Sequence, residues 1–170
     1  MFENSDCTDC DLAHRCVHRC LPGLGDETCK LAIYLDSPSM VEDRTGRSWT
    51  GDNANFVNYC LDRMSVPREM VYRDYILKCY AAKLPGPKVE RMTMVARCSQ
   101  YRFANLEEMP GLRAMVVLGG LGCEAMLGHK TIGDKQGAEW KPLSPLMQQL
   151  VPHVWVGFSQ IGRASWRDRV

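Results

Sequence analysis

Apolar side chains along the chain gather in short continuous runs, and the stretches between these runs carry apolar residues at helical spacing. Runs rich in branched and aromatic residues predict four buried strands, over residues 30–36, 70–80, 113–120 and 153–159. Apolar residues three or four positions apart predict two amphipathic helices, over residues 53–64 and 88–103. A short helix is expected after the third strand, over residues 123–128.

The alternation of strands with helices predicts the fold class. Strands joined through helices form a mostly parallel sheet covered on both faces, so we expect an α/β sandwich. Ligands of such sheets bind beyond the carboxyl ends of the strands. The segments expected to carry chemistry therefore follow the strands, over residues 36–43, 79–87, 119–125 and 159–165.

The overall composition is that of an ordinary globular domain. The chain has 170 residues, of which 45% are apolar, so we expect one domain over residues 1–170 with a substantial core. The formal net charge is +1, so binding to nucleic acid would require a local basic patch. The first residues are polar and acidic, and no apolar run approaches the length of a membrane span. These features predict a cytoplasmic protein with no membrane partner.

Nine cysteines, an odd number, are the chemically unusual feature of the sequence. An odd count excludes a complete disulfide framework, and the cytoplasm keeps thiols reduced, so metal binding, catalysis or burial remain. Cys7 and Cys10 form a C-x-x-C pair, which places two thiolates on one turn. Cys79, in the second predicted strand, and Cys98, in the helix that follows, could supply two further ligands of an iron–sulfur cluster.

Two alternatives to such a cluster remain open on spacing alone. A local zinc knuckle would combine Cys7 and Cys10 with two of Cys16, His18 and Cys20, although this spacing is tighter than that of ordinary zinc fingers. In the other alternative, no thiol binds metal and each is buried as a small apolar group. Residue spacing does not decide between cluster, zinc and burial.

Several motifs occur in a fixed order along the chain. C-x-x-C-x-L begins at Cys7, and P-G-L-G, D-S-P, E-D and G-R-S-W-T-G-D-N-A follow it, all within residues 7–54. V-Y-R-D-Y-I-L-K-C occupies residues 71–79, and residues 115–128 combine an apolar strand, L-G and a helix ending in L-G. Together these motifs resemble those of the iron–sulfur uracil-DNA glycosylases, the family-4 type, and they are collinear with them from Cys7 to about Ser159.

The resemblance implies a fold and a cofactor. The implied fold is an α/β three-layer sandwich around a central, mostly parallel four-stranded sheet, with an N-terminal cluster-binding segment. The implied cofactor is a 4Fe-4S cluster held by Cys7, Cys10, Cys79 and Cys98. Its expected role is structural and not electron transfer. The family pattern has no place for three further thiols, those of Cys16, Cys20 and Cys29.

The resemblance also implies roles for residues that follow the first strand. A base buried in the stack must be flipped into a pocket before it can be excised. Trp49 stands at the family's phenylalanine and would stack on that base. Asp36 stands at the family's catalytic glutamate and would direct the attacking water, with Ser37 and Pro38 beside it in contact with the substrate.

The chain departs from the family at two positions of this site. Tyr75 replaces the asparagine that reads the uracil edge, and a tyrosine hydroxyl cannot offer that amide's paired donor and acceptor. Asp74 faces the other side of the strand and cannot replace it. Ser159 stands where the family has a histidine that stabilises the departing base, and serine cannot carry imidazolium charge. The Glu42–Asp43 pair is kept and is expected to hold its loop rather than do chemistry.

Two functions are expected from the resemblance. In the first, a divergent uracil-DNA glycosylase-like protein binds single- or double-stranded DNA and excises uracil or a related modified pyrimidine by base flipping and hydrolysis of the N-glycosidic bond. In the second, the chain is a catalytically degraded DNA-binding or replication-accessory module, with replication proteins as partners. A monomer is expected in both cases. Arg163 and Arg167 are expected to contact phosphate, and a solvated terminus is the alternative for this basic stretch.

Overall fold

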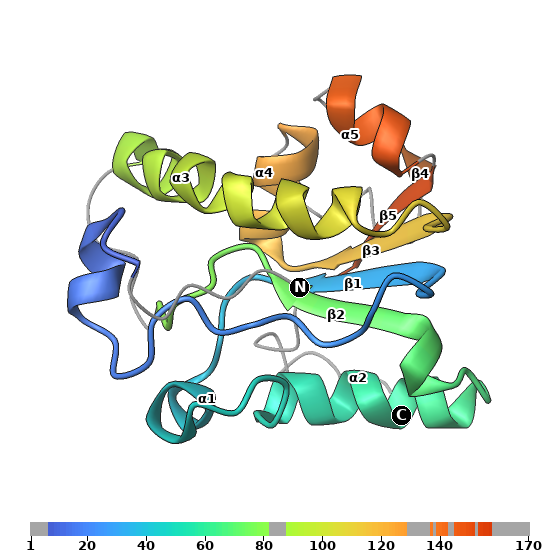
Figure 1. Cartoon of the computed structure of the whole chain (residues 1–170), viewed down its shortest axis with the longest axis horizontal. Helices are drawn as coiled ribbons and strands as arrows, with labels where there is room; N and C mark the ends of the chain where they lie inside the picture. The colour runs from blue at the N-terminus through green and yellow to red at the C-terminus, as the bar shows by residue number, and fades with distance from the viewer. Residues whose placement is uncertain are drawn as a thin grey trace, which may run out of the picture.

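A computed structural model of the chain describes residues 7–81, 88–128, 137, 139–142, 145–151 and 153–157. Its centre is a five-stranded sheet in the order β2-β1-β3-β5-β4 (Figure 1). The strands are β1 (Leu31–Leu35), β2 (Val71–Tyr75), β3 (Ala114–Leu118), β4 (Glu139–Trp140) and β5 (His153–Gly157). β1, β2, β3 and β5 pair in parallel, and β4 pairs antiparallel with β5. The predicted α/β class is confirmed, and β4 is an addition to the four expected strands.

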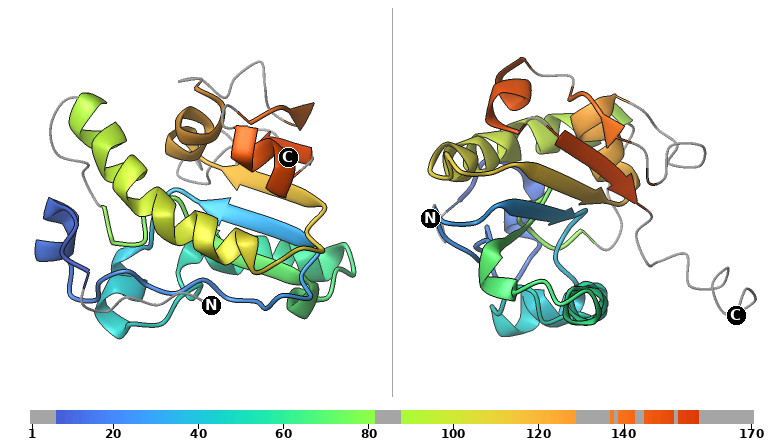
Figure 2. Two further views of the ribbon diagram at one scale, coloured as in Figure 1. Left: turned by 45° about the horizontal axis from the view of Figure 1, so that its top comes forward. Right: turned by 90° about the vertical axis from the view of Figure 1, so that its right-hand side faces the viewer.

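Helices cover both faces of this sheet (Figures 1 and 2). One layer holds α2, with α1 close to its amino end, and the other holds α3, α4 and α5. The helices are α1 (Met40–Thr45), α2 (Asp52–Arg63), α3 (Lys88–Glu107), α4 (Gly120–Leu127) and α5 (Pro145–Leu150), with the 3-10 turns η1 (Asp11–His14) and η2 (Arg68–Met70). None of the helices in the described part of the chain is long and apolar enough to cross a bilayer.

Neighbouring residues of the strands face opposite layers, which divides the core in two. Ala32 and Tyr34 of β1 pack in the cluster that includes residues of α3 and α4. Ile33 and Leu35 pack with residues of α2. Continuous apolar runs in the sequence reflect this arrangement, because a parallel sheet buries both of its faces.

Several predicted elements have other bounds in the structure. The helix expected over residues 123–128, for example, begins at Gly120. The second strand was expected over residues 70–80, but β2 ends at Tyr75 and residues 76–79 form a buried bend. Ile76 N and Leu77 N still donate to Leu35 O and Asp36 O, so this bend follows the sheet without belonging to it. The helix expected over residues 88–103 continues to Glu107. The residues of this bend are buried and therefore apolar, so their pattern in the sequence resembles that of a strand.

The N-terminal segment is tied to the edge of the sheet and to α1. Leu24 forms an antiparallel bridge with Arg73 of β2, and Leu21 N donates to Lys78 O at 2.8 Å. On the other side, the Asp43 carboxylate of α1 accepts the backbone N–H groups of residues 17 and 18 at 2.9 and 3.1 Å. The segment that carries the first cysteines is therefore held against the bend that follows β2.

Candidate functional site

Six cysteine side chains converge where the N-terminal segment, the bend after β2 and α3 meet. Cys10, Cys79 and Cys98 belong to one core cluster, and Cys16 packs against it. Cys7 packs with Cys20 and Tyr101, and the thiols of Cys7 and Cys10 lie close enough to influence that of Cys98 electrostatically. All six are free thiols, and all but the partly exposed Cys16 are buried. The structure thus brings together the four predicted cluster ligands, Cys7, Cys10, Cys79 and Cys98.

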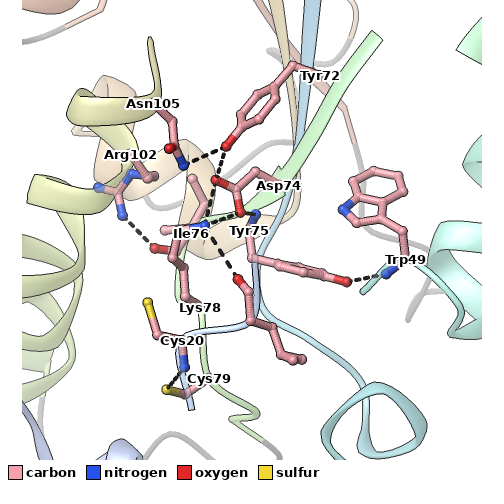
Figure 3. Close-up of polar contacts among 11 residues, drawn as sticks. Cys20, Trp49, Tyr72, Asp74, Tyr75, Ile76, Lys78, Cys79, Arg102 and Asn105 are labelled. Carbon is pink, nitrogen blue, oxygen red and sulfur yellow. Dashed lines mark hydrogen bonds and ion pairs between the residues drawn. The ribbon is translucent and has the colours of Figure 1, made fainter. Parts of the chain in front are cut away.

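Backbone N–H groups lie beside two of these sulfurs. Cys20 N donates to Cys79 Sγ at 3.3 Å, from a backbone with φ of 44° (Figure 3). Tyr101 Oη lies 3.5 Å from Cys7 Sγ, but it donates its single proton to Asp9 Oδ2 at 2.6 Å. The backbone N–H of Lys78 lies beside the Cys98 thiol and favours its thiolate. Such donors stabilise thiolates, as a metal centre with thiolate ligands requires.

Burial nevertheless favours the neutral thiol while no cation is bound. Desolvation raises the pKa of Cys79 well above its ordinary value, and desolvation likewise raises the pKa of Cys98. The N–H groups of Cys20 and Lys78 oppose these shifts only in part. A thiolate-binding metal centre would supply the missing positive charge, so the chemistry of these side chains fits an iron–sulfur cluster.

His18, a candidate ligand of the local zinc knuckle, packs against α1. Within the residues that the structure describes, no group of three or more His, Cys, Asp or Glu side chains is placed to hold a metal ion, at the zinc knuckle or among the four predicted cluster cysteines. His18 turns towards α1, where its Nδ1 lies 2.5 Å from Asp43 O. Cys29, a further thiol without a family role, lies away from the group and donates to Glu69 O at 3.5 Å.

A second group of buried side chains lies where β2 ends and the α1–α2 loop begins. Tyr75 Oη donates to Glu42 Oε1 at 2.7 Å. The same hydroxyl accepts the backbone N–H of Trp49 at 2.8 Å (Figure 3). The rings of Tyr75 and Trp49 lie 6.1 Å apart between centroids, tilted by 36°. Tyr75, Glu42 and Trp49 are 0%, 2% and 3% exposed. We call these three residues the tyrosine lock.

The tyrosine lock differs from the sequence interpretation of Trp49, which rested on its polar, glycine-rich loop. The Trp49 side chain lies in the α2 layer of the core instead, and the guanidinium of Arg73 lies 6.0 Å from the centre of its ring. A backbone φ of 59° at Trp49 turns the side chain inward. Its ring has no open face for a base in this structure, and stacking by Trp49 stays a prediction that requires the lock to open.

Glu42 holds the loop, as expected from the sequence. Ser39 begins α1 with a capping box, in which its N–H donates to Glu42 Oε2 at 2.6 Å. Thr50 N donates to Glu42 Oε1 at 3.0 Å. The contact between Glu42 and Tyr75 was not foreseen, because the two residues are 33 positions apart and no local pattern joins them.

The Asp36 carboxyl group is turned towards α4, away from the layer that holds the tyrosine lock. Its Oδ1 accepts the N–H of Gly122 at 2.9 Å, at the amino end of that helix. Burial raises the pKa of Asp36, and bonds from the first amides of α4 oppose the shift. Gly119 has a φ of 130°, and a Cβ there would come within 2.3 Å of the carboxyl group. The structure therefore assigns Asp36 a capping contact, and its water-directing role stays a prediction.

The other predicted site residues lie beside these groups or outside the described residues. Ser37 is partly exposed, and its hydroxyl donates to Pro38 O at 3.3 Å. Pro38 is buried. Ser159, Arg163 and Arg167 lie outside the described residues, and their roles stay predictions.

Asp74 lies in a fully buried polar network on the opposite face of β2 from Tyr75, as strand alternation predicts. Lys78 Nζ lies 2.7 and 2.9 Å from its two carboxylate oxygens (Figure 3). Tyr72 Oη donates to Asp74 Oδ2 at 2.7 Å and accepts from Asn105 Nδ2 at 2.7 Å. The network joins β2 to α3 directly beside Cys79, and sequence reasoning missed it.

Comparison with known proteins finds a distant similarity that agrees with the motif resemblance. No family model matches the chain. The chain is similar to the type-4 uracil-DNA glycosylase of Archaeoglobus fulgidus, with 29% identity over 105 residues. That alignment covers 62% of the chain and 51% of the glycosylase, so it spans about half the length of that relative. The similarity indicates a distant relation to uracil-DNA glycosylases.

Proposed function

We propose that the chain is a DNA-glycosylase-like protein that binds DNA and whose pyrimidine pocket is closed by its own tyrosine lock. The similarity to a uracil-DNA glycosylase supports DNA as the ligand. The observation that carries the proposal is the pair of hydrogen bonds at the buried Tyr75 hydroxyl, which donates to Glu42 Oε1 and accepts the backbone N–H of Trp49. A DNA-binding module that does not excise uracil is the function that this geometry favours.

The lock opposes uracil in two ways. The Tyr75 ring fills space at the position that reads the uracil edge in the resembling family, and it packs against the ring that would stack on the base. Entry of a base would also break both bonds of the Tyr75 hydroxyl. Each buried polar group left unpaired costs about 1–3 kcal/mol, which is enough to lose recognition.

A specific observation favours excision as the second candidate function. The indole Nε1 of Trp49 is buried and meets no acceptor among the described residues, so a base carbonyl could accept its hydrogen bond. In this candidate the lock opens, Trp49 stacks on uracil or a related modified pyrimidine, and Asp36 directs water beside Ser37 and Pro38. Ser159 would then be the donor to the departing base. Weakening one such donor typically lowers the rate about 10²–10³-fold.

Incubation with uracil-containing single- and double-stranded DNA, followed by alkaline cleavage of abasic sites, separates the two functions. Fluorescence anisotropy of the same labelled DNA reports binding. We expect wild-type protein to bind without excision, and Tyr75→Asn combined with Ser159→His to produce measurable excision. Tyr59→Asn with Ser159→His is the matched control, because Tyr59 is 58% exposed on α2. Efficient excision by wild-type protein would establish the second function, and a lack of DNA binding would refute both.

We further propose that Cys7, Cys10, Cys79 and Cys98 hold a 4Fe-4S cluster. Their convergence, their burial and the N–H donors to Cys79 and Cys98 support this ligand set. The bound cluster would join the N-terminal segment to the bend after β2 as a structural staple. Protein purified without oxygen should be brown and contain about four iron atoms per chain. A colourless protein with one zinc ion would contradict the cluster.

A further inference from the structure

Half of the sheet face on the α2 side has no helix over it among the described residues. α2 packs with buried residues of β1 and β2, whereas β3 adds only the partly buried Val116 and Leu118 to that layer. Met115 and Val117 of β3, which belong to the opposite layer, are both 0% exposed. β3 lies between β1 and β5, and an interior strand of a parallel sheet is ordinarily buried on both faces. A cover from outside the described residues is therefore expected over this half.

An apolar groove of about 290 Å³ lies where this cover is missing. Residues of β1 and β3, among them Val116 and Leu118, line it on one side, and Phe56, Cys60 and Met64 of α2 line it on the other. Phe56 and Met64 are 44% and 64% exposed. None of the described side chains that line the groove is charged. Apolar surface gathered in one groove in this way marks a place where an apolar segment docks.

The last described residue, Gly157 at the end of β5, lies beside this groove. Gly157 pairs with Leu118, and a Cβ at Gly157 would come within 2.7 Å of the Leu118 side chain. Residues 158–170 follow in the sequence. As a helix they would span about 20 Å, and the strand β3 is about 16 Å long. The segment is therefore long enough to run back along the whole of β3.

The sequence of residues 158–170 suits such a groove. At helical spacing, Phe158, Ile161 and Trp166 fall on one face, and Arg163 and Arg167 fall on the opposite face. A helix divided in this way buries its apolar face against the protein and keeps its cations in water.

We propose that residues 158–170 fold back from β5 and dock in this groove as an amphipathic helix. Phe158, Ile161 and Trp166 face the sheet and α2, while Arg163 and Arg167 face outwards. The docked segment completes the α2 layer over β3. A second copy of the chain is the competing occupant, and the continuity of the chain from Gly157 favours the segment. The inference depends neither on DNA binding nor on the proposed cluster.

Alkylation of Cys60 tests the docking, because this partly exposed thiol lines the groove. The full chain is treated with iodoacetamide for increasing times, and mass spectrometry of its peptides gives the labelling rate of Cys60. We expect Ile161→Ser with Trp166→Ser to raise that rate about tenfold or more, because only a transiently opened form of the wild-type protein reacts. Arg163→Ser with Arg167→Ser, on the opposite face, is the matched control and should leave the rate unchanged.

The outcomes distinguish the segment from a second copy of the chain. Equal labelling of Cys60 in wild-type protein and in Ile161→Ser with Trp166→Ser would overturn the docking. Wild-type labelling that slows as protein concentration rises, with a dimer in light scattering, would also overturn it and assign the groove to a second copy.

Two further measurements exclude a general loss of structure. A thiol introduced by Tyr59→Cys should react equally fast with and without the two serine substitutions, because Tyr59 is 58% exposed on α2. If the double variant does not fold, hydrogen exchange of wild-type protein decides. Protected amides over residues 161–167 would support the docked helix, and unprotected amides there would overturn it.

Discussion

Replacing Lys78 with methionine is expected to destabilise the fold severely. Lys78 and Asp74 are both 0% exposed, and the ammonium group contacts both carboxylate oxygens of Asp74. Methionine keeps the apolar stem but removes the charge, which leaves a buried carboxylate without its ion-pair partner. Breaking a buried pair in this way typically costs about 3–5 kcal/mol.

The remaining contacts of Asp74 place the expected loss at the lower end of that range. Tyr72 Oη and Tyr75 N still donate to its carboxylate at 2.7 and 2.8 Å. The buried guanidinium of Arg102 also lies near enough to interact electrostatically with Asp74. We therefore expect a loss of about 3 kcal/mol in the free energy of unfolding.

Urea unfolding followed by tryptophan fluorescence measures this loss, with all variants in the same state of metal loading. At an m-value of about 2 kcal/mol per molar urea, the midpoint should fall by about 1.5 M. Arg68→Met is the matched control, because its pair with Asp62 is about half exposed and such surface pairs contribute little to stability. Asp74→Asn added to Lys78→Met should recover part of the loss. A Lys78→Met midpoint equal to that of Arg68→Met would refute the reasoning.

Three further variants test the tyrosine lock and the Asp36 contact. Tyr75→Phe removes a donor to the buried Glu42 carboxylate and should cost about 1–3 kcal/mol in urea unfolding, whereas an unchanged midpoint would refute the lock. Burial raises the pKa of the Asp36 carboxyl group above 3.8, so the ionised carboxylate destabilises the folded state. This destabilisation is absent below that pH and grows as the pH rises through the folded-state pKa. Asp36→Asn should therefore gain stability relative to wild type as pH rises from about 4 to 7, and a constant difference would contradict this. Gly119→Ala should lower the free energy of unfolding by about 1–3 kcal/mol, because only glycine readily adopts the backbone conformation at this position. Gly120→Ala is the control: its Cβ would meet open space, so thermal unfolding should be nearly unchanged.

The proposed cluster site shows which ligands residue spacing can predict and which contacts it cannot. A C-x-x-C pair and two distant cysteines are visible in the sequence, and the family resemblance selects Cys7, Cys10, Cys79 and Cys98 from the nine. No family motif contains Cys16. Its packing against the buried residues around Cys79 depends on how the segment after η1 meets the core, and that packing is a long-range property.

The buried polar contacts of β2 were beyond sequence reasoning for the same physical reason. The pattern of β2 places Asp74 and Tyr75 on opposite faces, but it does not identify what each face meets. Lys78 follows Asp74 by four positions in a segment whose apolar pattern predicts a strand, and in a strand these two side chains would lie too far apart to form an ion pair. The bend at residues 76–79 brings them together.

The sequence by itself determined the layered α/β architecture, because burial of both sheet faces imposes continuous apolar runs and helical periodicity that any chain of this fold must display. The sequence also predicts that the chemistry lies after the strands, and it identifies four of the converging thiols. Only the tertiary structure decided that Trp49 is enclosed, that Asp36 caps α4 and that Tyr75 bonds to Glu42. These outcomes depend on contacts between residues tens of positions apart, where a side chain's partner is set by how whole elements pack and not by its neighbours in the chain.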